Sequence, residues 1–365
     1  MGKVILALLL FGGGTFVAIA QQQPPAAGQN DPTLIQRPPA PPLTQQGAVA
    51  AEGRFHLDVR VTERSGKPIT GLGPQDFTLL DESKPRTILS FRSFDGVQVR
   101  ANPPVEVILL VDAVNGGGAQ MALAREQIDQ FLRSNGGHLA APVTIMLLTE
   151  AGLRVQPRPS TDGNALVTVL DKITASVHTL TSAMGGEGLV ERFQKSAKAL
   201  ALIADNESKR PGRKLLLWIG PGWPQLRAED LVYSKRNQEL NFDSIVSILT
   251  KLREGRLEIF SVGGGAEYYF QDYLKPVRTE AQANPPNLAL QVLAVESGGA
   301  TFDPGNITDL GGELGRIVQD AGAFYSISFD PPAAEHANEF HELKVQVKQP
   351  GVMVRTLAGY YGQPQ

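Results

Sequence analysis

The chain has 365 residues, of which 42% are hydrophobic and 19% charged, enough to bury one sizeable core and a smaller second one. Its formal net charge is -3 and its lysines and arginines are spread along the chain, which excludes the basic footprint typical of a nucleic-acid-binding protein. It contains no cysteine, so disulfides, thiolate chemistry and cysteine-based metal sites are excluded.

Residues 1–20 have the pattern of a secretory signal peptide. Lys3 supplies the positive start, residues 4–17 form an apolar run, and the AIA at 18–20 is a small-x-small cleavage signal. A permanent membrane anchor is the competing interpretation, but the run is shorter than the ~20 residues that span a bilayer and contains glycines. We therefore expect a secreted protein, periplasmic or extracellular, whose only membrane contact is this segment if it stays uncleaved.

Two further segments precede the main domain. Residues 21–53 are rich in glutamine, proline and alanine and have almost no large apolar side chains, which predicts a disordered tether. In residues 54–98, apolar and polar residues alternate over 55–62 and again near 77–79 and 88–94, as in half-buried antiparallel strands. This second segment is too short to be stable alone.

Residues 103–322 alternate between strands and helices. Strands are expected at 105–113, 141–150, 152–159, 213–224 and 256–265, and helices at 119–134, 164–173, 188–208, 242–255 and 309–320. The continuous apolar run VEVILLVDA is typical of a strand covered on both faces. The alternation predicts a doubly wound, mostly parallel α/β sheet, in which ligands bind at the carboxyl ends of the strands.

Residues 323–362 return to strands with a period of two. Tyr325, Ile327 and Phe329 alternate with polar residues, as do Leu343 and Val345 further on. The simplest architecture pairs this carboxyl-terminal part with the strands of residues 54–98. The α/β domain is then inserted in a small antiparallel β-sandwich.

Three stretches carry a resemblance to a known family. They are VRVTERSGKPITGLGPQDFTLLDESKPRTILSF at 59–91, VILLVDAVN at 107–115, and YSISFDPP with FHELKVQVKQPGVMVRTLAGYYG at 325–362. Together they resemble the VWFA-related domain proteins found widely in Acidobacteria, over residues 54 to 362. The resemblance implies a von Willebrand factor A-like fold for residues 103–322.

The resemblance also implies a metal-ion-dependent adhesion site at the end of the first α/β strand. Its first motif, Asp-x-Ser-x-Ser, would supply oxygen ligands for Mg²⁺. Asp112 matches the aspartate, but Val114 and Gly116 stand at the serine positions, and Asn115 is a possible substitute. Alternatively, Asp112 is a strand-end carboxylate that accepts N–H bonds from the glycine turn at 116–118.

The remaining ligands of such a site come from later loops. Thr179 or Thr181 could supply the loop threonine, but the fourth strand ends in IGPG at 219–222, where no acid stands. The sequence therefore predicts a degenerate site and no cofactor, with bound Mg²⁺ or Ca²⁺ kept open as an alternative.

Aromatic residues gather in the loops expected at the same end of the sheet. Trp223 follows the fourth strand, and Tyr268, Tyr269 and Tyr273 follow the next one. Aromatic side chains give a large contact area at low entropy cost, which suits a protein-binding surface. The alternative, packing onto neighbouring helices, is favoured for Phe270 and left open for the tyrosines.

No enzyme class is indicated, because HExxH and GxSxG are both absent. The acidic and histidine-containing run at 335–342 could bind a metal ion, but it is more typical of a solvated hairpin loop. We expect a secreted protein-binding or adhesion module that uses the loops at the carboxyl ends of the sheet to hold a protein partner. Two alternatives are a structural component of a cell-envelope assembly acting through the β module, and an unrecognised hydrolase.

Overall fold

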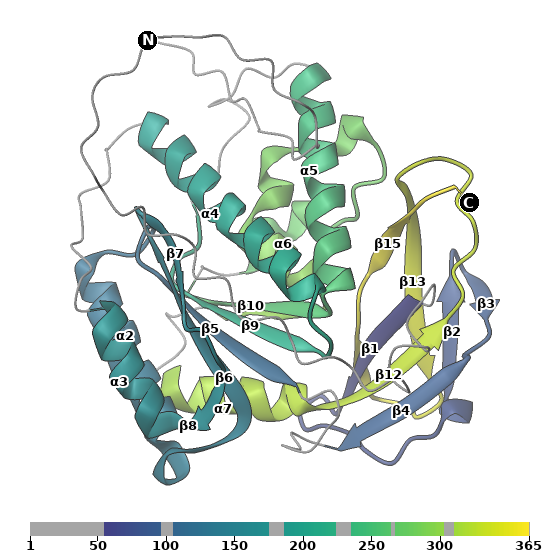
Figure 1. Cartoon of the computed structure of the whole chain (residues 1–365). Helices are drawn as coiled ribbons and strands as arrows, with labels where there is room; N and C mark the ends of the chain where they lie inside the picture. Colours follow the sequence, from purple (N-terminus) through teal and green to yellow (C-terminus); the bar gives the residue numbers. More distant parts are fainter. Residues whose placement is uncertain are drawn as a thin grey trace.

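The structure is a computed structural model that describes residues 55–95, 105–174, 186–223, 235–263, 267–302 and 310–364. The predicted signal peptide and tether lie outside these residues. Within them the strands form three sheets, a large α/β sheet and two smaller antiparallel sheets that face each other (Figure 1). No helix in the described ranges is long and apolar enough to cross a bilayer.

The two antiparallel sheets form the expected β-sandwich from both ends of the chain. Their strand orders are β14-β1-β12-β4 and β15-β13-β2-β3. The strands are β1 (Phe55–Thr62), β2 (Phe77–Asp81), β3 (Lys84–Arg86), β4 (Ser90–Asp95), β12 (Ala323–Phe329), β13 (Glu339–Val347), β14 (Met353–Arg355) and β15 (Gly359–Gly362).

The alternation read from the sequence fills the core of this sandwich. Leu57 and Val59 of β1 are fully buried, and they pack in one cluster with Ile327 of β12 and Leu343 of β13. Strand β12 pairs antiparallel with both β1 and β4, which joins the amino-terminal and carboxyl-terminal segments in one sheet. The predicted pairing of the two segments is therefore confirmed.

The large sheet has the strand order β11-β10-β9-β5-β6-β7, with β8 also paired to β6. Neighbouring strands from β11 to β6 are parallel, as predicted. The strands are β5 (Glu106–Asp112), β6 (His138–Thr149), β7 (Gly152–Val155), β8 (Ser160–Asp162), β9 (Lys214–Ile219), β10 (Leu257–Val262) and β11 (Ala300–Phe302). Every residue of β5, β9 and β10 is buried, because helices cover both faces.

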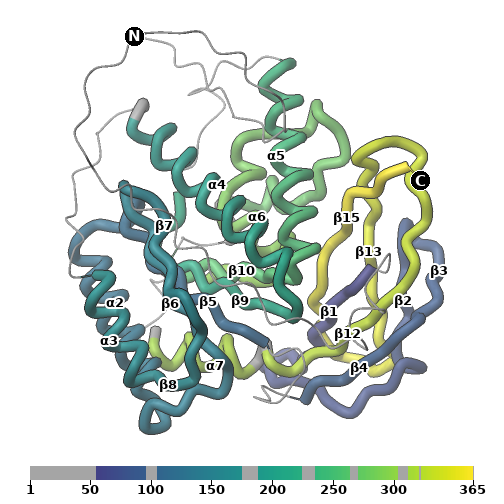
Figure 2. Tube along the Cα trace, viewed as in Figure 1, coloured from purple at the N-terminus to yellow at the C-terminus, as the bar shows by residue number. Residues whose placement is uncertain are grey.

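A layer of helices covers each face of the large sheet (Figures 1 and 2). One face packs on α2, α3 and α7, and the other on α4, α5 and α6. The helices are α2 (Gly118–Arg133), α3 (Gly163–Thr174), α4 (Gly186–Ser208), α5 (Lys235–Glu254), α6 (Leu290–Glu296) and α7 (Leu310–Gly322). Short 3-10 turns are η1 (Pro74–Asp76), η2 (Ser134–Gly137), η4 (Glu267–Tyr273), η5 (Glu280–Gln282) and η6 (Pro285–Leu288).

One part of the predicted series differs. The strand expected at 152–159 is present over Gly152–Val155, but it does not extend the parallel series, because β7 turns back after β6 and pairs antiparallel with it. Only two residues, Glu150 and Ala151, separate the two strands, so a crossover helix has no room. The doubly wound α/β class itself is confirmed.

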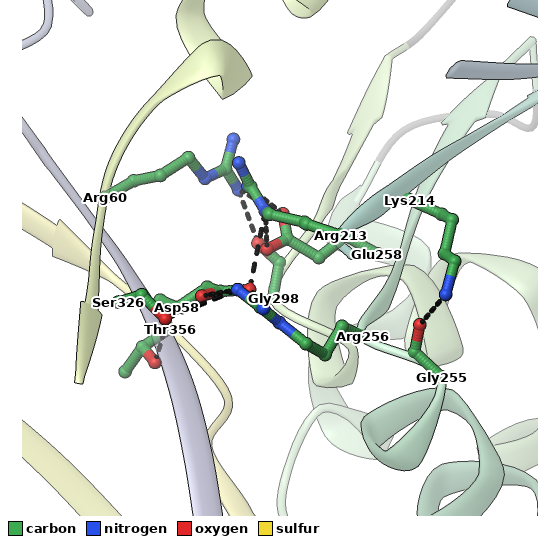
Figure 3. Close-up of polar contacts among 10 residues, drawn as sticks. All are labelled: Asp58, Arg60, Arg213, Lys214, Gly255, Arg256, Glu258, Gly298, Ser326 and Thr356. Atoms are coloured by element: carbon green, nitrogen blue, oxygen red, sulfur yellow. Dashed lines mark hydrogen bonds and ion pairs between the residues drawn. The ribbon is translucent and has the colours of Figure 1, made fainter. Parts of the chain in front are cut away.

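A buried charge cluster joins the sandwich to the amino ends of the α/β strands (Figure 3). Arg256, just before β10, donates through Nε and Nη2 to the two carboxylate oxygens of Asp58 in β1, at 3.1 and 2.6 Å. Arg213, just before β9, holds Glu258 in the same two-pronged way, at 2.8 and 2.7 Å. Arg60 of β1 also reaches Glu258, at 3.8 Å. Because β1 belongs to the sandwich, these contacts fix it against one end of the large sheet.

Lys214 ties two helix ends to the same region. Its Nζ donates to the carbonyl oxygens of Glu207 at 2.8 Å and Gly255 at 3.0 Å, and also to that of Arg210. Burial lowers the pKa of Lys214 to about 8. The ammonium group thus satisfies carbonyls at the carboxyl ends of α4 and α5, where the helix dipole favours a cation.

Candidate functional site at the carboxyl end of the sheet

Asp112, the last residue of β5, has no exposed surface and accepts four hydrogen bonds. Its Oδ1 accepts from the backbone N–H groups of Val114 at 3.1 Å and Asn115 at 3.0 Å. Its Oδ2 accepts from Nδ2 of Asn115 at 2.8 Å and from Nε1 of Trp218 at 2.9 Å. The donors come from the turn that follows β5 and from the neighbouring strand β9.

This arrangement uses the full acceptor capacity of the carboxylate. Each carboxylate oxygen has two lone-pair positions, and each oxygen of Asp112 already receives two N–H groups. Burial raises the pKa of Asp112, while these hydrogen bonds act in the opposite direction and favour the ionised form. The carboxylate therefore offers no free position to a metal ion.

The alternative interpretation of Asp112 from the sequence is half right. It is a strand-end carboxylate held by backbone N–H groups, but those groups belong to Val114 and Asn115 rather than to the glycines at 116–118. The N–H of Gly117 instead donates to Oε1 of Gln120, at 3.1 Å, at the start of α2. The glycine turn therefore serves the helix start.

Asn115 links the carboxylate of Asp112 to helix α4. Its Nδ2 also donates to Oγ of Ser196 in α4, at 2.9 Å, and Ser196 is completely buried. Its Oδ1 is buried without a hydrogen-bond partner. That oxygen is a single neutral acceptor, and the neighbouring Val114 and Gly116 have no coordinating side chain.

The described residues therefore do not fit a Mg²⁺ or Ca²⁺ site. Divalent cations of this kind take six or more oxygens, and here one orphan amide oxygen lies beside a saturated carboxylate. Within the described ranges, no three His, Asp or Glu side chains come together in a way that could hold a metal ion. Thr179 and Thr181 lie outside the described residues.

The aromatic residues named from the sequence lie in different environments. Trp223 is only 5% exposed, and its Nε1 donates to the carbonyl oxygen of Leu288 at 2.9 Å. Its ring meets that of Trp218 edge to face at 5.3 Å, so Trp223 belongs to the core and not to an open surface. Tyr273 is half-buried and packs beside Phe270, which is buried as expected.

Tyr268 and Tyr269 fall in the η4 turn (Glu267–Tyr273), but their side chains lie outside the described part of the structure. The binding role of these tyrosines stays a prediction.

Two residues that build this site were missed from the sequence. Trp218 completes the carboxylate cage and Ser196 anchors Asn115, yet neither is close to Asp112 in the chain. Trp218 comes close to Asp112 because β9 lies directly beside β5 in the sheet, with Trp218 paired to Leu110. A signal was present in the sequence, since Trp218 is the one side chain with a polar group in the run LLLWI.

Gly220 closes the site from the end of β9. Its φ is +145°, and a Cβ built on it would lie 2.8 Å from the Cβ of Asp112. The chain therefore needs a glycine there to pass the carboxylate.

The two ends of the large sheet are unequal. At the amino end, helices lead into strands through short connections at 134–137, 209–213, 255–256 and 297–299, and the sandwich packs against this end. The carboxyl end, where β5 runs into the turn at 113–117 and β9 into residues 220–223, lies away from these contacts.

Comparisons with known proteins give structural similarities only. No family model matches the chain, and no curated protein matches it. The human COPII-coat protein Sec24c is similar with a TM-score of 0.36 and 10% identity, over 80% of this chain and 50% of that one. The chain thus spans about half the length of Sec24c.

Two other solved structures are similar at the same level. The SpRpn10 VWA domain has a TM-score of 0.28 and 12% identity, over 57% of this chain and 93% of that one. The pilus adhesin SpaC from Lactobacillus rhamnosus GG has a TM-score of 0.33 and 11% identity, over 81% of this chain and 43% of that one. These scores are low, and we base the fold class on strand order and helix layers alone.

Proposed function

We propose that this chain is a secreted protein-binding module of the VWFA-related type found in Acidobacteria, which holds its partner at the carboxyl end of the α/β sheet without a metal ion. The observation that carries the proposal is the inequality of the two sheet ends. The sandwich and its buried ion pairs occupy the amino end, so the carboxyl end, where Asp112 and Gly220 lie, is left for a partner.

The saturated carboxylate sets the mode of binding. In a metal-dependent adhesion site the ion would bridge this strand end to a carboxylate of the partner. Here Asp112 is sealed beneath Asn115 and Trp218, so recognition uses side chains of the surrounding connections. The candidate partner contacts are Thr179, Thr181, Tyr268, Tyr269 and Tyr273. On this proposal the chain is not an enzyme, and a hydrolase screen of the purified protein tests that part.

Isothermal titration of the purified chain with Mg²⁺, Mn²⁺ and Ca²⁺ tests the absence of a metal requirement. We expect no saturable heat from any of the ions. Saturable binding would show that the carboxylate cage opens, and metal-dependent adhesion would replace the proposal.

A pair of matched surface variants tests the location. Ala119→Arg places a bulky charge on the exposed first turn of α2, beside the carboxyl end of β5. Thr87→Arg places the same charge on the exposed connection between β3 and β4 of the sandwich. A partner isolated with the wild-type chain from cell-envelope material should be retained in EDTA and by Thr87→Arg, and released by Ala119→Arg. The reverse pattern would favour a structural role through the β module.

A further inference from the structure

A second surface, separate from the carboxyl end of the sheet, lies where α5 and the η5 turn meet β13 of the sandwich. It is a groove of about 570 Å³, within the range of ordinary ligand sites. Phe242 of α5 and Phe340 of β13 are its buried apolar part, 7% and 6% exposed. Both rings meet Tyr361 edge to face, which fixes their positions across the junction of the two units.

The charged side chains of the groove carry an excess of negative charge. Glu82, Glu280 and Glu339 line it, together with the single arginine Arg278. That arginine is already paired twice, through Nη1 to Oε1 of Glu82 at 3.2 Å and through Nη2 to Oε2 of Glu342 at 2.9 Å. Its charge is therefore balanced, and the groove retains carboxylates that can receive a cation.

Two of these carboxylates are held in the ionised form. The N–H of Glu342 and the guanidinium of Arg278 lower the pKa of Glu82. The N–H groups of Glu335 and His336 lower the pKa of Glu339. These two carboxylates therefore keep their charge to a lower pH than an ordinary glutamate does.

The groove is also preorganised. Glu82, in the β2–β3 turn, and Asn338, just before β13, have positive φ values of 48° and 60°, a conformation that residues other than glycine adopt uncommonly. Glu82 is held there by the N–H of Glu342, at 2.8 Å, and Asn338 by Nε2 of Gln363, at 2.7 Å. Because these contacts fix the two turns before any ligand arrives, binding orders little additional chain.

We propose that this groove binds a polypeptide segment of a partner protein through an arginine side chain. Arg278 already shows how an arginine sits at this place, since its guanidinium lies 5.2 Å from the centre of the Phe340 ring and pairs with carboxylates on either side. A guanidinium from the partner would lie at the rim of the groove beside Arg278 and pair with the exposed Glu280, because Phe242 and Phe340 themselves are buried. Arginine fits better than lysine, because its planar group can pair with a carboxylate through two N–H groups.

The test uses fluorescence anisotropy of the full chain with a fluorescein-labelled peptide of alternating arginine and glycine. The same peptide with citrulline in place of arginine keeps the shape and removes the charge. We expect saturable, salt-sensitive binding of the arginine peptide and none of the citrulline peptide. Equal binding of both peptides, or binding of neither, would overturn the proposal.

Variants locate the site on the protein. Ala281→Trp fills the groove, and we expect binding to weaken roughly tenfold or more. Glu280→Gln removes one exposed carboxylate and should weaken binding about two- to fivefold. Glu126→Gln, an exposed position on α2 outside the groove, removes the same charge elsewhere and should leave binding unchanged.

Thermal unfolding of each variant separates a lost site from a lost fold. If Ala281→Trp folds normally and still binds the arginine peptide as the wild type does, the groove is not the site. The result is independent of the carboxyl end of the sheet, since Ala119→Arg leaves every residue of the groove in place.

Discussion

Glu296, the last residue of α6, should make the protein less stable as the pH rises from acidic to neutral. It lines a small enclosed cavity of about 20 Å³ between α5, α6 and β15, together with Arg253, Tyr360 and Tyr361. Burial raises the pKa of Glu296 to about 8 from its ordinary value of 4.5. At neutral pH the folded protein therefore keeps a proton on this carboxyl group that the unfolded chain releases.

The sign and size of the effect follow from linkage. Below pH 4.5 the carboxyl is protonated in both states and has no effect on stability. Between pH 4.5 and about 8, each pH unit lowers the free energy of unfolding by about 1.36 kcal/mol, which gives an upper bound of about 5 kcal/mol. Glu296 is half-buried overall, so screening by solvent reduces the expected loss to about 2–3 kcal/mol. Above pH 8 the loss stays constant.

Glu296→Gln removes this titration and keeps the shape of the side chain. Urea unfolding of the wild type and the variant across the range from pH 4 to pH 9 should show the variant gaining stability over the wild type until about pH 8 and then keeping a constant advantage. Glu126→Gln, at an exposed position, is the control and should follow the wild type. A stability difference that does not change with pH would refute the reasoning.

Three further substitutions test the contacts described above, each by urea unfolding. Trp218→Phe removes one hydrogen-bond donor from the buried Asp112 and leaves a space where the indole was, so we expect the free energy of unfolding to fall by about 2–4 kcal/mol. An unchanged urea midpoint would show that this hydrogen bond does not stabilise the fold. Asp58→Asn leaves the guanidinium of Arg256 without its carboxylate at the junction of the two units and should cost about 3–5 kcal/mol, against little change for Asp95→Asn at the exposed end of β4. Gly220→Ala should cost more than about 1 kcal/mol, because alanine has to adopt a positive φ and its Cβ meets Asp112; wild-type stability would contradict this.

The fold was predictable because the decisive patterns are local. The unbroken apolar run of β5 predicts a strand buried on both faces, and the alternation of β1 predicts a strand buried on one face. The alternation was misleading for the second face of β1. Asp58 and Arg60 have the periodicity of a solvated face, yet both lie against the α/β unit, with side chains only 8% exposed. An alternating pattern shows that one face of a strand is polar, but it does not show whether another folded unit covers that face.

The site was predictable in position but not in chemistry. Asp112 was placed correctly at a strand end, because a carboxylate after an apolar run marks that end. Its partner Trp218 comes from a strand that is adjacent in the sheet and distant in the chain, so no spacing rule could find it. Trp223 was expected in the open because it follows a strand and a glycine turn. In the structure it is buried, because its ring packs on Trp218 and its Nε1 reaches the carbonyl oxygen of Leu288, which is distant in the chain.

The α/β unit leaves and rejoins the sandwich at neighbouring positions. Asp95, the last residue of β4, lies directly opposite Ala323, the first residue of β12, and α7 runs into β12 without an intervening residue. Residues directly opposite each other in an antiparallel pair have Cα atoms only about 4.5–5.5 Å apart, a gap that a two-residue turn can close. The two chain crossings between the sandwich and the inserted unit therefore lie side by side, at a spacing that a short hairpin turn could span.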